Sequence, residues 1–177
     1  MHSKNLADVI KNDNFRKTVQ QKRQKDCIMR NSQNSNSAEQ QMAERILFEK
    51  VKQWLNIDII ANEKIPIGKT FMQPDFYSKK HAIIGEIFSH IGKPKKAQDN
   101  KIANDILKML LLEKSEHKTY RKIIVVCDEE ERIHLEGISV LSECIRQFGI
   151  EIKLIEIDAD LRTMLTDAQK RQQMINA

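Results

Sequence analysis

The chain has 177 residues, of which 40% are apolar and 31% are charged, and its formal net charge is +5. This length is sufficient for one domain with a hydrophobic core, and the composition excludes a disordered or membrane-embedded protein. The longest apolar runs, residues 109–112 and 123–127, are far too short to cross a bilayer, and the first residues lack the apolar stretch of a secretory signal. We therefore expect a cytoplasmic protein without a membrane partner.

The excess positive charge lies at the beginning of the chain. Residues 1–36 contain eight lysines and arginines but three acidic residues, so this segment alone accounts for the net charge and the rest of the chain is neutral. A basic arm suits a polyanion such as DNA, because neutralised phosphates release their counterions. A solvated helix that only aids solubility explains the charge equally well. The polar stretch 31–36 is typical of a linker, which divides the chain into an arm, 1–36, and a domain, 37–177.

The domain is expected to begin with a helix. Ser37 and Gln40 form a capping-box pattern, and apolar residues follow at helical spacing as far as Leu55. Three strand-like segments come next, and they span 57–67, 70–77 and 81–91. The last two are joined by residues 78–80, which are few enough for a hairpin.

The second half of the chain alternates helices and strands. We expect helices at 97–114, 133–148 and 160–174, and strands at 122–127 and 150–157. The segment 122–127 is apolar throughout, as in a buried central strand. The acidic run 128–131 reads as a solvated turn that leads into a helix. This order of elements predicts an α/β fold with a mixed sheet between helices.

The three cysteines, Cys27, Cys127 and Cys144, are far apart in the sequence. They form neither a zinc-binding CxxC pattern nor an even set for disulfide pairing. We therefore expect free thiols, as in a reducing cytoplasm.

Two acidic residues, Asp75 and Glu86, lie on neighbouring strands of the expected hairpin. If Lys79 and Lys80 form a two-residue turn, Asp75 lies opposite Ile84 and diagonal to Glu86 on one face; a slightly longer loop of the same parity places the acids opposite each other. Burying both without a partner is costly, whereas Mg²⁺ binds one or two carboxylates together with water. The spacing predicts a cation site; exposed acids, or acids paired with lysines, are the alternative.

The segment Pro74-Asp75, followed by Glu86 in the next strand, resembles the signature of the PD-(D/E)XK, or restriction-endonuclease-like, nuclease superfamily. The order of elements from Ser37 to about Cys127 is similar to the αβββαβ core of that family. The resemblance covers about half of the chain. It implies a mixed sheet flanked by helices around that core.

The resemblance also implies an activity and a metal. The expected activity is that of a Mg²⁺-dependent phosphodiesterase, most simply a DNA endonuclease, and Mn²⁺ can substitute for Mg²⁺. Asp75, Glu86 and the main-chain carbonyl of Ile87 are then the metal ligands. The bound ion activates water and stabilises charge on the phosphodiester.

The sequence departs from the family pattern at Phe88, where the signature has a lysine that positions the attacking water. Some members of the family supply this lysine from the following helix. The lysines available after the strand are Lys93, Lys95, Lys96 and Lys101. We favour Lys101, together with Gln98, although its helical position points away from the apolar face.

Two further residues are candidates on weaker grounds. Many members of the family place a glutamate on the first helix, and Glu44 is preferred to Glu49 because it lies within the apolar arc. His90 shares the face of Glu86, so it is a candidate contact for the scissile phosphate or a base. An ordinary surface acid and a hydrogen-bonded histidine are the alternatives for Glu44 and His90.

The basic stretch that follows the third strand contains Lys93, Lys95 and Lys96. A basic loop there would contact the phosphate backbone beside the site of cleavage. A solvated loop is the alternative reading.

The sequence therefore predicts a metal-dependent nuclease that acts on nucleic acid, and DNA is the expected substrate. The small size suggests a homodimer that cuts both strands, or a partner protein that supplies specificity. A catalytically inactive nucleic-acid-binding module on the same fold is the second hypothesis, because Phe88 replaces the lysine. A plain interaction protein of a defence or mobile-element system is the third.

Overall fold

The computed structural model describes residues 38–176, so the basic arm, the linker and the predicted capping residue Ser37 lie outside the described residues. The first helix, residues 38–55, precedes five short strands. The strands are β1 (Ile60–Ala61), β2 (Ile65–Ile67), β3 (Thr70–Met72), β4 (Phe76–Ser78) and β5 (Ile83–Phe88). The later elements are α2 (Lys96–Glu116), β6 (Arg121–Val126), α3 (Glu129–Leu135), α4 (Val140–Gln147), β7 (Ile150–Leu154) and α5 (Ala159–Asn176).

Five strands form a mixed sheet in the order β1-β4-β5-β6-β7. The pairs β1–β4 and β4–β5 are antiparallel, whereas β5–β6 and β6–β7 are parallel. The central strands β5 and β6 are almost entirely buried, and for β6 the apolar run in 122–127 predicts this burial. The predicted class, an α/β fold with a mixed sheet between helices, is confirmed.

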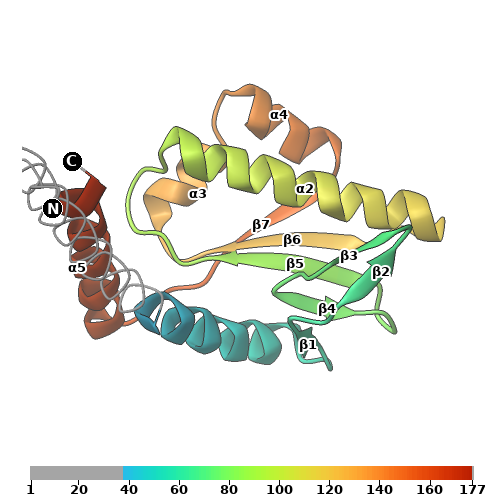
Figure 1. Cartoon of the computed structure of the whole chain (residues 1–177), viewed down its shortest axis with the longest axis horizontal. Helices are drawn as coiled ribbons and strands as arrows, with labels where there is room; N and C mark the ends of the chain where they lie inside the picture. The colour runs from blue at the N-terminus through green and yellow to red at the C-terminus, as the bar shows by residue number, and fades with distance from the viewer. Residues whose placement is uncertain (1–37, 177) are drawn as a thin grey trace, which may run out of the picture.

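Helices cover both faces of this sheet (Figure 1). On one face, Ile84 and Phe88 of β5 pack with Ile102, Ile106 and Met109 of α2, and α3 and α4 extend the same layer. On the other face, alternate residues of β5 pack against the first helix and α5. Residues of opposite parity on β5 therefore enter different cores, so Glu86 shares the α2 side with Phe88.

The strands predicted at 57–67 and 70–77 are each divided in two, which is a correction to the sequence analysis. Asn62 has a left-handed φ of 53° and interrupts the first segment between β1 and β2. Pro74 falls between β3 and β4 and cannot donate a main-chain hydrogen bond, so it interrupts the second. The strands β2 and β3 pair only with each other in a separate two-stranded sheet.

The loop between β4 and β5 is longer than the two-residue turn considered above. Ser78 pairs with Ile83 rather than with His81, and residues 79–82 form the turn, in which Ala82 has a φ of 50°. The parity of the pairing is unchanged, so the same side chains share a face. Continuing the register from Phe76–Gly85 by one step places Asp75 opposite Glu86 instead of Ile84.

The single helix predicted at 133–148 is two helices. Asp128 caps α3 by accepting a hydrogen bond from the main chain of Glu130 (3.0 Å). Ser139 caps α4 by accepting one from the main chain of Ser142 (3.0 Å), after the break around Gly137. The acidic run 128–131 is consequently not a solvated turn: it begins α3, and Glu131 is completely buried.

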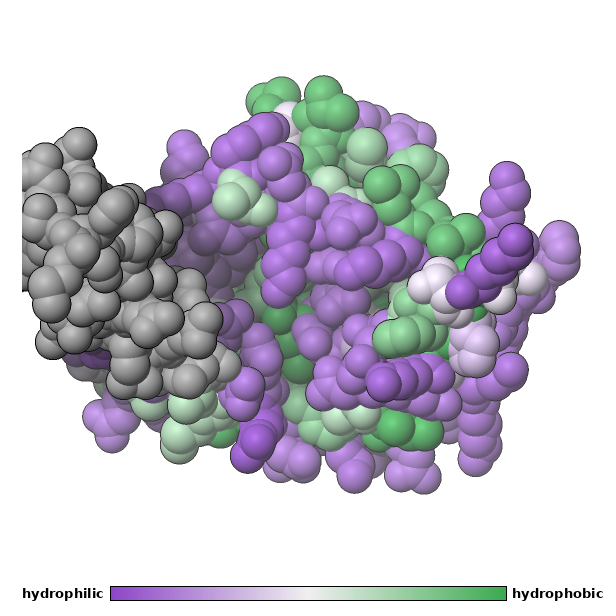
Figure 2. Space-filling model, viewed as in Figure 1, coloured by the Kyte–Doolittle hydropathy of each residue, from purple (hydrophilic) through white to green (hydrophobic). Residues whose placement is uncertain are grey.

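Apolar side chains also gather on the surface over α2 and α4, where Figure 2 shows a group of hydrophobic residues. Leu107, Val140 and Phe148 border a groove of about 490 Å³ there. Among the residues that the structure describes, no helix is both long enough and apolar enough to traverse a membrane. The two cysteines of this part, Cys127 and Cys144, are free, as predicted.

Candidate metal centre

The main chain around Asp75 explains why the β4–β5 pairing ends there. The Asp75 carbonyl accepts a hydrogen bond from the main chain of Asn62 (3.3 Å), so the Asp75 main chain faces β1. The neighbouring Pro74 then faces β5, in register with Ile87. The next pair of ladder hydrogen bonds would join Pro74 and Ile87.

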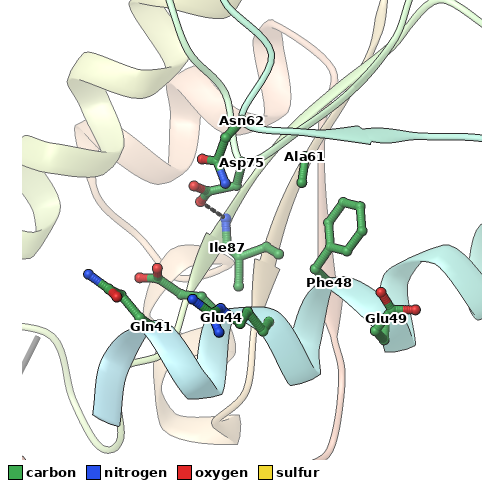
Figure 3. A pocket seen from close by; sticks show the side chains of 9 residues that line it. Gln41, Glu44, Phe48, Glu49, Ala61, Asn62, Asp75 and Ile87 are labelled. Carbon is green, nitrogen blue, oxygen red and sulfur yellow. Dashed lines mark hydrogen bonds between the residues drawn. The ribbon is translucent and has the colours of Figure 1, made fainter. Parts of the chain in front are cut away.

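Pro74 cannot complete that pair because proline has no N–H. The Ile87 N–H instead donates to the Asp75 carboxylate, at 2.7 Å from Oδ2 (Figure 3). The N–H and C=O of one strand residue point to the same side, so the Ile87 carbonyl is directed to the same edge without a donor from Pro74. The local sequence thus brings a carboxylate and a carbonyl oxygen together.

Glu86 is the second carboxylate, and it lies beside the first. The Asp75–Glu86 position is a non-hydrogen-bonded one in the extended register, the type at which opposite side chains approach most closely. Glu86 is only 7% exposed and forms a hydrogen bond with the Asp75 carboxylate. Burial, followed by the charges of Asp75 and Asp105, raises the pKa of Glu86 to about 9. In the absence of a cation, Glu86 therefore keeps its proton at neutral pH beside the Asp75 carboxylate.

Two residues of α2 complete this environment, and the sequence analysis missed both. Asp105 is 3% exposed, and its charge acts on Glu86. Lys108 Nζ lies 2.6 Å from Asp105 Oδ1, and the charges of Glu86 and Asp75 contribute to raising the pKa of Lys108, after its hydrogen bond with Asp105. The signal was available, since Asp105 falls among Ile102, Ile106 and Met109 on the buried face of α2.

The first helix brings Glu44 towards the pair, as predicted. Burial and then the charge of Asp75 raise the pKa of Glu44. Glu44, Asp75 and Ile87 line a cleft of about 530 Å³. Glu49 also lines this cleft, but Figure 3 shows it farther along the helix, away from Asp75.

A second, smaller pocket of about 140 Å³ shares Ile87 with the first. Its lining includes three other predicted residues, His90, Gln98 and Lys101. Lys101 extends over the Phe88 ring, with Nζ 5.0 Å from the ring centroid. Its charge acts on Glu44 and on Glu131. Lys101 therefore lies over Phe88, whereas Lys108 is the lysine whose charge acts on Glu86.

Gln98 and His90 also line the second pocket, and each has a structural hydrogen bond. The Gln98 side-chain oxygen accepts from the main chain of Lys95 (2.7 Å) and caps α2, which leaves the amide NH₂ for other partners. His90 Nδ1 lies 3.2 Å from the Gly92 carbonyl. A carbonyl only accepts, so Nδ1 carries the hydrogen and the neutral ring presents Nε2 as an acceptor. Burial lowers the pKa of His90.

The basic loop after β5 is solvent-accessible. Lys93, Lys95 and Lys96 are exposed, while Pro94 between them is buried. The loop leads from the end of β5 into α2, so these lysines lie at the same end of the sheet as the carboxylate pair. Their contact with nucleic acid stays a prediction.

The available donor atoms are oxygens, which suit a hard cation that keeps several water ligands. Within residues 38–176, no group of three or more His, Cys, Asp or Glu side chains is arranged to hold a metal ion. Asp75, Glu86 and the Ile87 carbonyl would supply oxygen ligands from two side chains and the main chain, and Mg²⁺ commonly completes such a set with water. The raised pKa of Glu86 beside Asp75 marks a position at which a cation would be favourable.

Comparison of the chain with models of protein families, with curated proteins and with solved structures yields no match. The chemistry of the site is therefore inferred from the arrangement of Asp75, Glu86 and Ile87.

Proposed function

We propose that this chain is a metal-dependent phosphodiesterase with a restriction-endonuclease-like core, and that its substrate is nucleic acid, most simply DNA. The observation that carries the proposal is the juxtaposition of Asp75 and Glu86 near the end of β5, where Glu86 is buried and the half-buried Asp75 raises its pKa. Two carboxylates placed side by side repel each other when both are charged, and a divalent ion removes that repulsion.

The proposed metal site uses the Asp75 and Glu86 carboxylates and the Ile87 carbonyl. Mg²⁺, or Mn²⁺ in its place, would supply a polarised water and charge stabilisation at the phosphodiester. Glu44 lines the same cleft as Asp75 and Ile87 from the first helix, and its raised pKa would let it hold a proton beside them. Glu44 is thus proposed as an accessory acid of the site.

A lysine of α2 is proposed to position the water or the scissile phosphate in place of Phe88. Lys101 extends over the Phe88 ring, and Gln98 lines the same pocket. Lys108 is held by Asp105 near the carboxylates. Replacing each lysine by methionine distinguishes the two. Loss of the lysine that positions the reacting groups should reduce kcat by about 10²-fold or more, whereas loss of the other should leave kcat unchanged.

Cleavage of supercoiled plasmid in Mg²⁺ or Mn²⁺ tests the proposal. The full chain is expected to nick or linearise the plasmid, and Asp75→Ala and Glu86→Ala are expected to abolish cleavage while the protein stays folded. Asp160→Asn, an exposed acid at the start of α5, is the matched control and should retain full activity.

The second candidate is an inactive nucleic-acid-binding module on the same fold. The burial of Phe88 in the core beneath α2, where the family has its lysine, favours this alternative. Tight binding that weakens with salt, without cleavage even in Mn²⁺, would identify the module. Weak and salt-insensitive binding would instead indicate the third reading, a protein-interaction domain.

Whether the chain works as a homodimer or with a partner protein that supplies specificity remains part of the proposal. A double-strand break by one site per chain requires either two copies or two successive events. The mass of the chain in solution with and without DNA, measured by light scattering, distinguishes these cases.

A further inference from the structure

We propose that the second pocket, beside the carboxylate pair, is a binding site for a phosphate group of the substrate, with Ser89 as a donor that the sequence analysis did not identify. The inference rests on the proposed function for the source of the phosphate. Its evidence and its first test are independent of any metal.

The two adjoining cavities have opposite chemistry. The larger cleft contains Glu44, Glu49 and Asp75 in its lining, with Arg45 as its cation. The smaller pocket contains no acid in its lining, and its polar groups come from Ser89, His90, Gln98, Lys101, Gln40 and Gln169. Ile87 belongs to both linings, so a cleft with three acids and a pocket without acids lie on either side of one residue.

Ser89 provides the observation that points to a ligand. It is 8% exposed, lines the smaller pocket, and its Oγ is buried without a hydrogen-bond partner. A buried hydroxyl without a partner is unfavourable, and native structures usually supply one. A phosphate oxygen in the pocket would accept this hydrogen bond.

Three other features support an anion over a neutral ligand. Lys101 brings a positive charge to the pocket. The Gln98 amide has its oxygen engaged with the main chain of Lys95, so its NH₂ is the group that can face a ligand. The pocket also lies next to the N-terminus of the 21-residue helix α2, whose dipole favours negative charge.

The pocket is large enough for a phosphate group. A volume of about 140 Å³ corresponds to about four or five water molecules at about 30 Å³ each, which is close to the space of one phosphorus atom with its oxygens. The pocket lies at the ends of the parallel strands β5 and β6, the usual position of ligands in such sheets.

The phosphate has two sources, the terminal phosphate of a strand or an internal phosphate next to the scissile one. The same donors would recognise both. The residues alone do not select between them, so the experiment is designed to do so.

The first measurement is calorimetric binding of inorganic phosphate to the full chain in the presence of a chelator. The wild-type protein is expected to bind phosphate at millimolar concentrations, and Ser89→Ala is expected to bind it about tenfold more weakly, as for loss of one hydrogen bond to a charged group. Lys101→Met should weaken binding at least as much. Lys114→Met, an exposed lysine near the other end of α2, is the control and should bind normally.

Ser89→Ala should also leave the unliganded protein as stable as wild type or more so, because it removes an unsatisfied hydroxyl. Asp75→Asn should retain phosphate binding, which separates this site from the metal centre. The proposal would be overturned if the wild type does not bind phosphate or if Ser89→Ala binds it normally. It would also be overturned if all variants bind with equal affinity, which would indicate an adventitious ion only.

The second measurement identifies the source. Cleavage of linear oligonucleotides with a 5′-phosphate or a 5′-hydroxyl, and of circular plasmid, is compared for wild type and Ser89→Ala. An increase of KM confined to the 5′-phosphorylated substrate assigns the pocket to a strand end; an equal increase for all three assigns it to an internal phosphate. If none of the substrates is cleaved by wild type while phosphate binding behaves as stated, the proposed function fails but the phosphate site stands.

Discussion

The two ends of the central sheet are built from similar polar residues but satisfy them differently. Where β5 and β6 begin, the Tyr77 and Tyr120 hydroxyls lie 3.1 Å apart, Tyr120 donates to Glu116 (2.5 Å), and Lys122 pairs with Glu113 (2.7 Å). Each buried polar group there has a partner of complementary charge or hydrogen-bonding type. This end has the features of a structural network.

Where β5 and β6 finish, Asp128 pairs with Arg162 (2.6 Å), but several other buried polar groups lack such partners. Glu86 lies beside another acid, Asp75. Among the residues that the structure describes, the buried side-chain atoms without a hydrogen bond belong to Ser89, Asp105 and Glu131, all near this end. Buried polar residues alone therefore do not identify a binding site. Buried polar groups without partners do, because a bound ligand would offset the free-energy cost of burying them.

The largest effect on stability is expected at the satisfied end. Lys122→Met leaves Glu113 half-buried without its cation, and it should lower the free energy of unfolding by about 3–5 kcal/mol. Glu86→Gln at the other end should leave the metal-free protein as stable or more stable, because an amide relieves the repulsion from Asp75 and can still donate to it. Urea unfolding of both variants measures the contrast. A large loss of stability in Glu86→Gln would mean that both ends are structural.

Glu131, one of the buried groups without a partner, should make the stability of the protein depend on pH. Burial, and then the charge of Asp128, raises the pKa of Glu131 to about 8, so between its unfolded pKa near 4.5 and about 8 the folded protein keeps a proton that the unfolded chain releases. Stability must therefore fall as the pH rises through this window, by up to about 1.4 kcal/mol per pH unit from this group.

Glu131→Gln removes this contribution. The difference in unfolding free energy between the variant and wild type should shift in favour of the variant by about 1 kcal/mol per pH unit between about pH 5 and about pH 8. The other titrating groups are common to both proteins and cancel in the difference. Parallel stability curves would show that Glu131 is ionised in the folded state.

The fold could be read from the sequence wherever the pattern was long and regular. The continuous apolar run 122–127 and the helical periodicity of α2 predicted the central strand and its covering helix. The short strands β1 to β4 could not be separated in the same way, because the left-handed Asn62 and the strand-ending effect of Pro74 depend on their neighbours in the folded chain.

The site was foreseen in part for the same reasons. The parity of the β4–β5 loop fixed the common face of Asp75 and Glu86, and that prediction holds for the longer loop because its parity is the same. Asp105 and Lys108 lie about 20 residues farther along the chain, and their proximity to Glu86 follows only from the packing of α2 on β5. Ser89 gave no signal in the sequence, since an unsatisfied hydroxyl is visible only in the fold.

A smaller effect is expected for the exposed lysines of the β5–α2 loop. Replacing Lys93, Lys95 and Lys96 together by glutamine should weaken DNA binding by about tenfold at moderate salt and reduce the slope of log affinity against log salt by about 0.9 for each lost phosphate contact. The same replacement at Lys69, Lys80 and Lys114, which are also exposed, is the control. Equal effects of both triple variants would indicate non-specific attraction rather than a defined contact.

The central claim is that one divalent ion takes the place of the proton that Glu86 holds beside Asp75. Calorimetric titration of Mn²⁺ into the full chain, in buffers of different ionisation enthalpy and from about pH 6 to about pH 8, tests it directly. We expect release of about one proton per ion bound and an affinity that rises up to tenfold per pH unit below the pKa of Glu86 near 9, with both effects lost in Glu86→Gln. Binding that is absent, or independent of pH and unchanged in Glu86→Gln, would contradict the claim.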